Sequence, residues 1–232
     1  MKKNIFITGC SKGIGNAILK QFSSGEYCIY GLGTKKRKYN NIDYYNVDLS
    51  KVSNINNFKK KIEKLNIDIL INNAGINKIN YFHKIKKNEF NEVFNVNFMA
   101  AYHFSQAVIP GMIKKKWGRI INISSIFGEV TKEKRSSYSI SKFSLKSLTK
   151  SLGIEYSKYG ILTNCVAPGV VNTDLTKKIL NLNDKKDFLK KIPIGRFAEP
   201  EDIASLVYWL ASPDNKYVTG QHILIDGGYT LL

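Results

Sequence analysis

The sequence has few cysteines and histidines and no long apolar run, and each shortage excludes a class of protein. Its three cysteines, Cys10, Cys28 and Cys165, lie far apart and form no Cys-x-x-Cys pair, which argues against a disulfide framework or a zinc site. The three histidines show no metal-ligand spacing, so we expect no bound metal. The apolar stretch in the opening MKKNIFITGC is too short for a signal peptide, and no stretch is long enough to cross a bilayer. We therefore expect a soluble cytoplasmic protein with reduced thiols and no membrane partner.

Acidic residues are also scarce, since 18 Asp and Glu stand against 36 Lys and Arg, a formal net charge of +18. Such an excess ordinarily suggests a nucleic-acid partner. However, the lysine runs are spread along the whole chain without interleaved aromatic residues: KKRK 35–38, KKKIEK 59–64, KIKK 84–87, KKK 114–116 and KEKR 132–135. We interpret them as a solvated surface and expect no nucleic-acid partner. The positive field would still attract anionic substrates and cofactors.

Short β-rich apolar runs alternate with longer segments of helical period along the chain. The predicted strands are 4–8, 27–31, 43–47, 67–71, 119–123, 162–166 and 222–226. The predicted helices are 14–24, 51–65, 88–115, 138–158 and 199–212, with an irregular one near 174–191. This alternation predicts an α/β fold, a doubly wound parallel sheet of seven strands with helices on both faces. At 232 residues, one domain over 1–232 is expected.

The first strand leads directly into a glycine-rich turn, TGCSKGIG at 8–15, and then into a helix. Strand, glycine turn and helix in this order aim backbone N–H groups and a helix N-terminus at a pyrophosphate. Gly9 would permit the tight turn, Gly13 the approach of the phosphates, and Gly15 the packing of helix on strand. A connection without a ligand is the alternative, but it would not need three glycines.

A second motif is SSYSISK at 136–142, which puts Tyr138 and Lys142 one helical turn apart. Taken alone, this motif is explained by an exposed helix start with a capping serine and an ordinary surface lysine. A catalytic interpretation needs support from the rest of the chain.

That support comes from the spacing Gly-x-x-x-Gly-x-Gly together with NNAG at 72–75, which resembles the short-chain dehydrogenase/reductase family. The resemblance covers nearly all of residues 3–231 and implies a Rossmann-type fold. Further matching pieces follow in the family's order: NVNF with Asn97, IINISS ending at Ser125, Tyr138 with Lys142, PGVVNT at 168–173 and VTGQHILIDGG at 218–228.

The resemblance implies that Tyr138 is the catalytic acid/base, that Lys142 activates it, and that Ser125 binds the substrate carbonyl. A phenol with a pKa near ~10 is a poor base, and a close ammonium would lower that pKa. Lys142 could also donate to the nicotinamide ribose. Ser125 would donate to an oxygen that becomes negative as hydride arrives. Asn97 would kink its helix and hold a water in a proton relay, or alternatively satisfy backbone groups.

The resemblance also implies a set of cofactor-binding residues. They are Gly9, Ser11, Lys12, Gly13, Ile14, Gly15, Thr34, Asp48, Leu49, Asn73, Ala74, Gly75, Tyr138, Lys142, Pro168, Gly169, Val171 and Thr173. Thr173 would hold the carboxamide, although PG at 168–169 could be a plain turn. Asp48 would bind the adenine, or equally cap the next helix. Part of NNAG is expected to serve the sheet.

The segment after the second strand, IYGLGTKKRK, offers no acid for a ribose 2′-hydroxyl. Lys12 stands where relatives that prefer NADP carry a basic residue, and Thr34 to Arg37 could add contacts to a 2′-phosphate. We therefore expect NADP(H) to be preferred, with NAD(H) possible, and reduction to be the direction. The general basic bias of the chain is the alternative explanation for these lysines.

Within the family, the chain most resembles the 3-oxoacyl-[acyl-carrier-protein] reductases, which implies a 3-oxoacyl thioester substrate. Lys116 matches the first of two basic positions that grip the acidic carrier protein, whereas Tyr159 stands at the second. The alternative substrate is a keto-sugar, polyol or other small carbonyl of cell-surface glycan synthesis. The resemblance further implies a homotetramer that pairs helices 88–115 and 138–158. A non-catalytic regulatory protein on this scaffold is disfavoured because Ser125, Tyr138 and Lys142 are all present.

Overall fold

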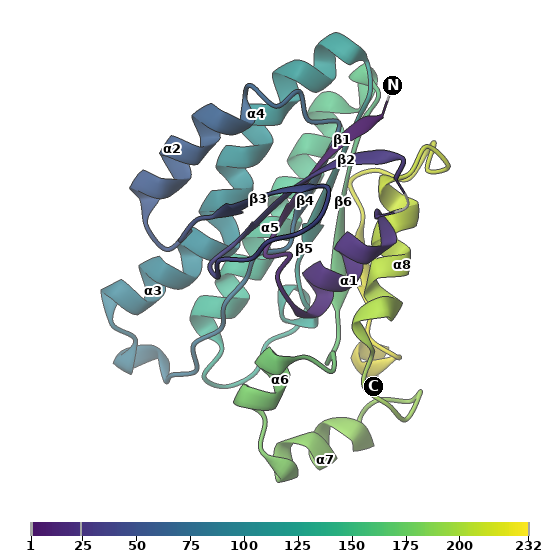
Figure 1. Cartoon of the computed structure of the whole chain (residues 1–232). Coiled ribbons are helices and arrows are strands. Elements are labelled where there is room, and N and C mark those ends of the chain that lie inside the picture. Colours follow the sequence, from purple (N-terminus) through teal and green to yellow (C-terminus); the bar gives the residue numbers. More distant parts are fainter. Residues whose placement is uncertain (1, 24, 232) are drawn as a thin grey trace.

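The computed structural model of the chain describes residues 2–23 and 25–231, which form one seven-stranded sheet between two layers of helices (Figure 1). All strand pairs are parallel, and the strand order is β3-β2-β1-β4-β5-β6-β7. The strands are β1 (Lys3–Thr8), β2 (Tyr27–Gly33), β3 (Ile42–Asn46), β4 (Ile69–Asn72), β5 (Gly118–Ile123), β6 (Ile161–Pro168) and β7 (His222–Ile225). The predicted fold class and all seven predicted strands are confirmed.

Successive residues of the central strands point into different helical layers, as a pleated strand requires. In β1, Ile5 and Ile7 pack with α1 (Gly13–Gln21) and α8 (Pro200–Ala211), which lie side by side in Figure 1. Phe6 points to the opposite face, into the core with α2 (Val52–Ile62) and α4 (Ala100–Lys115). Both faces of the strand are therefore buried, which explains why its sequence is a continuous apolar run.

The segment predicted as one helix over 88–115 contains a wider turn. It consists of α3 (Lys87–Phe94), a π-helical turn over Asn95–Met99, and α4. Asn97 occupies this turn, and π turns of this kind are frequent at functional sites. The next helix of this layer, α5 (Ser136–Tyr156), begins two residues before the predicted start, so Tyr138 lies in its first turn.

The irregular helix predicted near 174–191 is two helices, α6 (Asp174–Ile179) and α7 (Leu182–Lys190). The break falls before Asn181, whose side chain accepts a hydrogen bond from the Asp184 N–H at 2.8 Å and caps α7. We call residues 174–191 the lid. It projects below the sheet in Figure 1, beyond the carboxyl end of β6.

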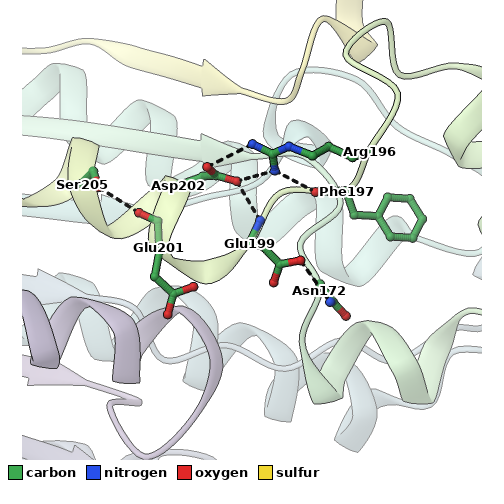
Figure 2. A network of polar contacts seen from close by, with 7 residues as sticks. All are labelled: Asn172, Arg196, Phe197, Glu199, Glu201, Asp202 and Ser205. Carbon is green, nitrogen blue, oxygen red and sulfur yellow. Dashed lines mark hydrogen bonds and ion pairs between the residues drawn. The ribbon is translucent and has the colours of Figure 1, made fainter.

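Polar contacts pin the chain on either side of the lid to the start of α8 (Figure 2). Before the lid, the Asn172 N–H donates to the Ala198 carbonyl at 2.8 Å, and its amide donates to Glu199 at 3.2 Å. After the lid, Arg196 forms an ion pair with Asp202 at 2.7 Å. The two ends of the lid are therefore held close together at the edge of the sheet.

Candidate active site

A groove of about 410 Å³ crosses the carboxyl ends of β1, β2 and β4 and reaches the start of α5. The glycine turn forms one wall. Gly9 and Gly13 have positive φ angles of 67° and 53°, which favour glycine. A Cβ on Gly9 would lie 2.9 Å from the Ala74 Cα, and one on Gly15 would lie 2.3 Å from the Gly9 carbonyl oxygen. The turn therefore requires glycine for its own close packing as well as for access to the groove.

The N-terminus of α1 opens into this groove. Lys12 is the N-cap residue, and no side-chain oxygen caps the helix, so the first N–H groups of α1 face the groove uncapped. Free N–H groups and the positive end of a helix dipole are suited to a phosphate. The glycines leave room for close approach, so the residues fit a dinucleotide.

Fifteen of the eighteen residues predicted to bind the cofactor line the groove. They are Gly9, Ser11, Lys12, Gly13, Ile14, Gly15, Thr34, Asp48, Leu49, Asn73, Ala74, Gly75, Tyr138, Lys142 and Thr173. The other three, Pro168, Gly169 and Val171, line an adjacent pocket instead. Lining residues that the sequence did not single out include Leu32, Val47, Ile76 and Val96. Val96 lies within NVNF and Ile76 directly follows NNAG, whereas Leu32 and Val47 are ordinary apolar residues at or beside strand ends that no motif marks.

Two of the groove residues also hold the fold together. The Asn73 amide donates to the carbonyls of Thr8 at 2.9 Å and Gly9 at 3.1 Å, which fixes the glycine turn to the end of β4. Asp48 accepts a hydrogen bond from the Ser50 N–H at 3.0 Å, and hydrogen bonding to the Ser50 side chain and backbone lowers the pKa of its carboxyl group. Asp48 therefore lines the groove and makes a local hydrogen bond, but the N-cap residue of α2 is Lys51, so the capping alternative is wrong.

The end of β2 carries no acid toward the groove. The lining residues there are Leu32, Gly33 and Thr34, and exposed Lys12 lies on the same wall. Of the basic run after β2, Lys35, Lys36 and Arg37 are exposed and do not line the groove. Lys12 is thus the cation of this group that borders the groove directly.

Tyr138, Lys142 and Ser125 meet where the groove joins the pocket. Tyr138 lines both cavities, Lys142 lines the groove and Ser125 lines the pocket. Lys142 is only 3% exposed, and its ammonium donates to the Ile123 carbonyl at 2.7 Å. The same Nζ lies 5.6 Å from the centroid of the Tyr138 ring. The structure therefore brings together the three residues that the sequence predicted to be catalytic.

The electrostatics of Tyr138 differ from the expectation. Burial raises the pKa of the phenol, while hydrogen bonding to Ser125 and the charge of Arg135 oppose the shift. The nearest polar partner of the Lys142 ammonium is a carbonyl, and burial lowers the pKa of Lys142 to about 8. Desolvation outweighs charge attraction here, so the phenol is protonated at neutral pH.

Asn97, the fourth predicted catalytic residue, is 2% exposed and reaches the loop after β4. Its amide accepts from the Ile76 N–H at 2.8 Å and donates to the Ile76 carbonyl and to Ser141 Oγ, each at 3.0 Å. A Cβ placed on Gly75 would lie 3.5 Å from Lys142 Nζ and 3.6 Å from Asn97 Oδ1, so both side chains border Gly75. Asn97 thus ties the π turn to this loop, and the backbone groups that it satisfies lie outside its own helix.

The pocket next to Tyr138 has a volume of about 130 Å³ and lies between the ends of β5 and β6 and the lid. Most of its wall is apolar, including Phe127, Leu180 and Phe188. Its polar lining includes Asn77 and Arg135, which the sequence did not single out. Arg135 belongs to the run KEKR, interpreted above as solvated surface. That interpretation is wrong for Arg135, which is 6% exposed.

The two positions considered for carrier-protein binding lie together, but away from this pocket. Lys116 ends α4 just before β5, and its carbonyl packs against Gly160, the neighbour of Tyr159. Ser125 follows the opposite end of β5. A six-residue strand spans about 20 Å, so within one chain Lys116 lies at the far edge of the sheet from the catalytic residues.

The described region contains neither a cluster of metal-binding side chains nor a membrane-spanning helix. Among residues 2–23 and 25–231, no group of three or more His, Cys, Asp or Glu side chains could hold a metal ion. No helix within these ranges is long and apolar enough to cross a membrane.

Comparison with known proteins identifies the class to which this site belongs. Residues 9–230 match the family model described as enoyl-(acyl carrier protein) reductase. The 3-oxoacyl-[acyl-carrier-protein] reductase of Vibrio harveyi is 35% identical over 236 residues, covering 97% of this chain and 96% of that protein. The corresponding reductase of Rickettsia typhi is 37% identical, covering 99% and 98%.

Two solved structures share the whole fold. A 4-hydroxyisoleucine dehydrogenase complexed with NADH has a TM-score of 0.93 and 31% identity, covering 99% of both chains. A gluconate 5-dehydrogenase from Burkholderia cenocepacia, in complex with NADP and tartrate, has a TM-score of 0.91 and 25% identity, covering 100% of this chain and 97% of that one. The fold, the groove and these relatives define an NAD(P)-dependent oxidoreductase. The chain belongs to the short-chain dehydrogenase/reductase family.

Proposed function

We propose that the protein reduces a carbonyl to a hydroxyl with NADPH, at the junction of the groove and the pocket. The observation that carries this proposal is the position of Tyr138, whose side chain borders both cavities. A nicotinamide bound in the groove supplies hydride to the carbonyl carbon. The glycine turn and the uncapped start of α1 would bind its pyrophosphate.

The residues at the junction have separate roles in this proposal. Ser125 donates a hydrogen bond to the carbonyl oxygen, which becomes negative as hydride arrives. Tyr138 then gives its proton to that oxygen. Because burial raises the pKa of Tyr138, the phenol holds this proton at neutral pH, which favours the reducing direction. Lys142 stabilises the phenolate that remains and binds the ribose, and Asn97 positions the loop beside them.

We further propose that NADPH is preferred over NADH. The end of β2 presents no carboxylate to the groove, and Lys12 borders it as an exposed cation. A cation favours a 2′-phosphate, whereas NAD enzymes usually place an acid on the 2′-hydroxyl. The relatives support both cofactors as possibilities, since one binds NADP and another NADH.

Two substrate classes are compatible with this chemistry. The 3-oxoacyl-[acyl-carrier-protein] reductases among the relatives support a 3-oxoacyl thioester on a carrier protein. The compact pocket and the cation of Arg135 favour the second class, a small polar carbonyl such as a keto-sugar. The gluconate and 4-hydroxyisoleucine dehydrogenases among the structural relatives support that class too. Lys116 lies far from the pocket of its own chain. It therefore does not support a carrier protein docked beside that pocket within a single chain.

We propose that the protein is a cytoplasmic homotetramer. Three apolar side chains on α5, Ile140, Phe143 and Ile154, are 42%, 41% and 82% exposed. Their spacing places them along one exposed stripe of the helix, as expected for a helix that pairs with a second copy.

Steady-state assays with NADPH test the function directly. The purified protein would be given acetoacetyl-carrier protein, a free acetoacetyl thioester, and a panel of keto-sugars and small oxo acids. We expect turnover of at least one compact carbonyl at a higher kcat/KM than the carrier-bound thioester. Efficient use of the carrier-bound thioester alone would support the first class instead. Absence of any carbonyl reduction by a protein that binds NADPH would refute the proposed function.

A further inference from the structure

The pocket contains a buried cation that the fold does not neutralise. Arg135 lies at the start of α5, three residues before Tyr138, and is 6% exposed. Its Nη1 atom is buried and has no hydrogen-bond partner among residues 2–23 and 25–231. The guanidinium carbon lies 5.6 Å from the centroid of the Phe127 ring, another pocket residue. Arg135 is thus almost surrounded by protein, lines the pocket, and has one donor without a partner.

The acidic residue Asp184 does not form an ion pair with the Arg135 guanidinium. Burial lowers the pKa of Arg135, and the charges of Tyr138 and then of Asp184 in the lid oppose this shift. No ion pair joins Arg135 and Asp184 in the described part of the chain, and the Asp184 carboxylate instead accepts the Asn181 N–H at 3.2 Å. A buried charge without a partner is costly, so a fold normally pairs it.

A second buried arginine shows what such pairing looks like in the same protein. Arg119 is 4% exposed and donates to the carbonyls of Gly118 at 2.8 Å, Gly160 at 3.3 Å and Asn215 at 2.8 Å. Two of its three guanidinium nitrogens are held by backbone oxygens, Nε alone has no partner among the described residues, and the side chain lines no cavity described above. Arg135 lacks such acceptors and lines the pocket that Ser125 also lines.

A residue with an unpaired hydrogen-bond acceptor lines the same pocket. Asn77 Oδ1 is buried and has no donor among the described residues. A guanidinium fork matches the paired oxygens of a carboxylate or phosphate, and an amide oxygen accepts from a hydroxyl or N–H group. The other polar groups of the wall are hydroxyls, such as those of Ser125, Tyr138 and Thr176, so Arg135 is the cation of this lining. A ligand that carries both groups would satisfy both orphan atoms at once.

We propose that Arg135 is a specificity-determining residue that binds an oxyanion, a carboxylate or a phosphate, on the substrate, while Ser125 and Tyr138 hold its carbonyl. Asn77 accepts a hydroxyl or N–H of the same molecule. This inference rests on the proposed function, the reduction of a carbonyl beside Tyr138. It narrows the substrate to a compact anionic carbonyl compound, an oxo acid or a keto-sugar acid or phosphate. The pocket that would receive it has a volume of about 130 Å³.

The test compares charged and neutral carbonyls in matched pairs: acetoacetate with methyl acetoacetate, and dihydroxyacetone phosphate with dihydroxyacetone. For wild type with NADPH we expect kcat/KM to be at least about tenfold higher for the charged member of one pair. Arg135→Gln should remove that preference while retaining use of the neutral member. Arg135→Lys should restore part of it, because it returns the charge without the fork. The exposed neighbour variant Lys134→Gln is the control and should keep the preference.

A binding measurement separates this inference from the proposed function. Malonate and inorganic phosphate would be titrated into NADPH-saturated wild type and Arg135→Gln by calorimetry. Binding of either anion to wild type and at least about tenfold weaker binding to the variant would support the oxyanion site even if no tested carbonyl is reduced. If wild type reduces neutral carbonyls as well as charged ones and binds neither anion, the inference is overturned while the proposed function stands. The inference would also be overturned if a folded Arg135→Gln lost kcat/KM equally for charged and neutral carbonyls. A wild type that neither reduces any tested carbonyl nor binds either anion would overturn it as well. Should the variant not fold, the wild-type comparisons decide alone.

Discussion

Replacing Lys142 by methionine should change how the stability of the protein depends on pH. Lys142 is buried, and burial lowers the pKa of its ammonium from 10.5 to about 8. Between these two values the unfolded chain binds a proton that the folded chain does not. The stability of the wild type should therefore rise with pH in this window, as the cost of the buried charge is relieved. Methionine has a similar length and no charge, so Lys142→Met should lack this rise.

The size of the effect follows from the two pKa values. From about pH 7 to about pH 9.5, the free-energy cost of the buried ammonium should fall by about 2 kcal/mol. Two neighbouring groups remain neutral over this range. Burial raises the pKa of Cys165 to about 11 and also raises the pKa of Tyr138. The difference between wild type and variant therefore isolates Lys142.

Urea unfolding of both proteins, followed by circular dichroism at several pH values, measures this difference. We expect the free energy of unfolding of Lys142→Met, relative to wild type, to decrease by about 2 kcal/mol from neutral to alkaline pH. A difference between the two proteins that stays constant across the range would refute the reasoning. It would mean that the folded protein does not perturb the lysine.

Three further predictions concern the groove, the π turn and assembly. Lys12→Ala should lower kcat/KM for NADPH by about tenfold with little change for NADH, because only the 2′-phosphate carries the extra charge. Lys20→Ala, at the far end of α1, serves as the control, and equal losses with both cofactors would contradict the assignment. Asn97→Ala should lower the free energy of unfolding by about 1–2 kcal/mol, since it removes the hydrogen bonds to the part-buried N–H and carbonyl groups of Ile76. An unchanged urea midpoint would contradict this. Light scattering should show a tetramer for wild type and smaller species for Ile154→Asp, because the substitution places a charge in the proposed interface. A monomeric wild type would exclude the proposed assembly.

The sheet and the groove were largely predictable because they depend on local patterns. Runs such as Ile69–Ile71 are buried on both faces, so they appear in the sequence as continuous apolar stretches. The glycine turn at 8–15 also has a local cause, since Gly9 and Gly13 adopt backbone angles that favour glycine. Both features could therefore be located before any tertiary contact was known.

The features that were missed depend on long-range contacts or on a weaker signal. The helical period of 88–115 does not mark the π turn, and the expected kink at Asn97 came from the family resemblance alone, because Asn97 is held by Ile76 from a distant loop. The break in the lid had a signal, because Asn181 and Asp184 have the spacing of a capping box. Arg135 looks like part of a charge run, and its burial follows from the packing of the lid and Phe127 around the pocket. The direction of the pKa shift of Tyr138 likewise depends on burial, which spacing does not reveal.

The most direct test of the account is single-turnover oxidation of bound NADPH by wild type and Tyr138→Phe, with the carbonyl substrate found in the steady-state assays. Removing only the hydroxyl keeps the ring that borders both cavities, so cofactor binding should persist, as checked by NADPH fluorescence. We expect the rate of hydride transfer to fall by at least about a thousandfold, because the proton donor is lost. Oxidation of NADPH by Tyr138→Phe at the wild-type rate would contradict the assignment of Tyr138 as the catalytic acid.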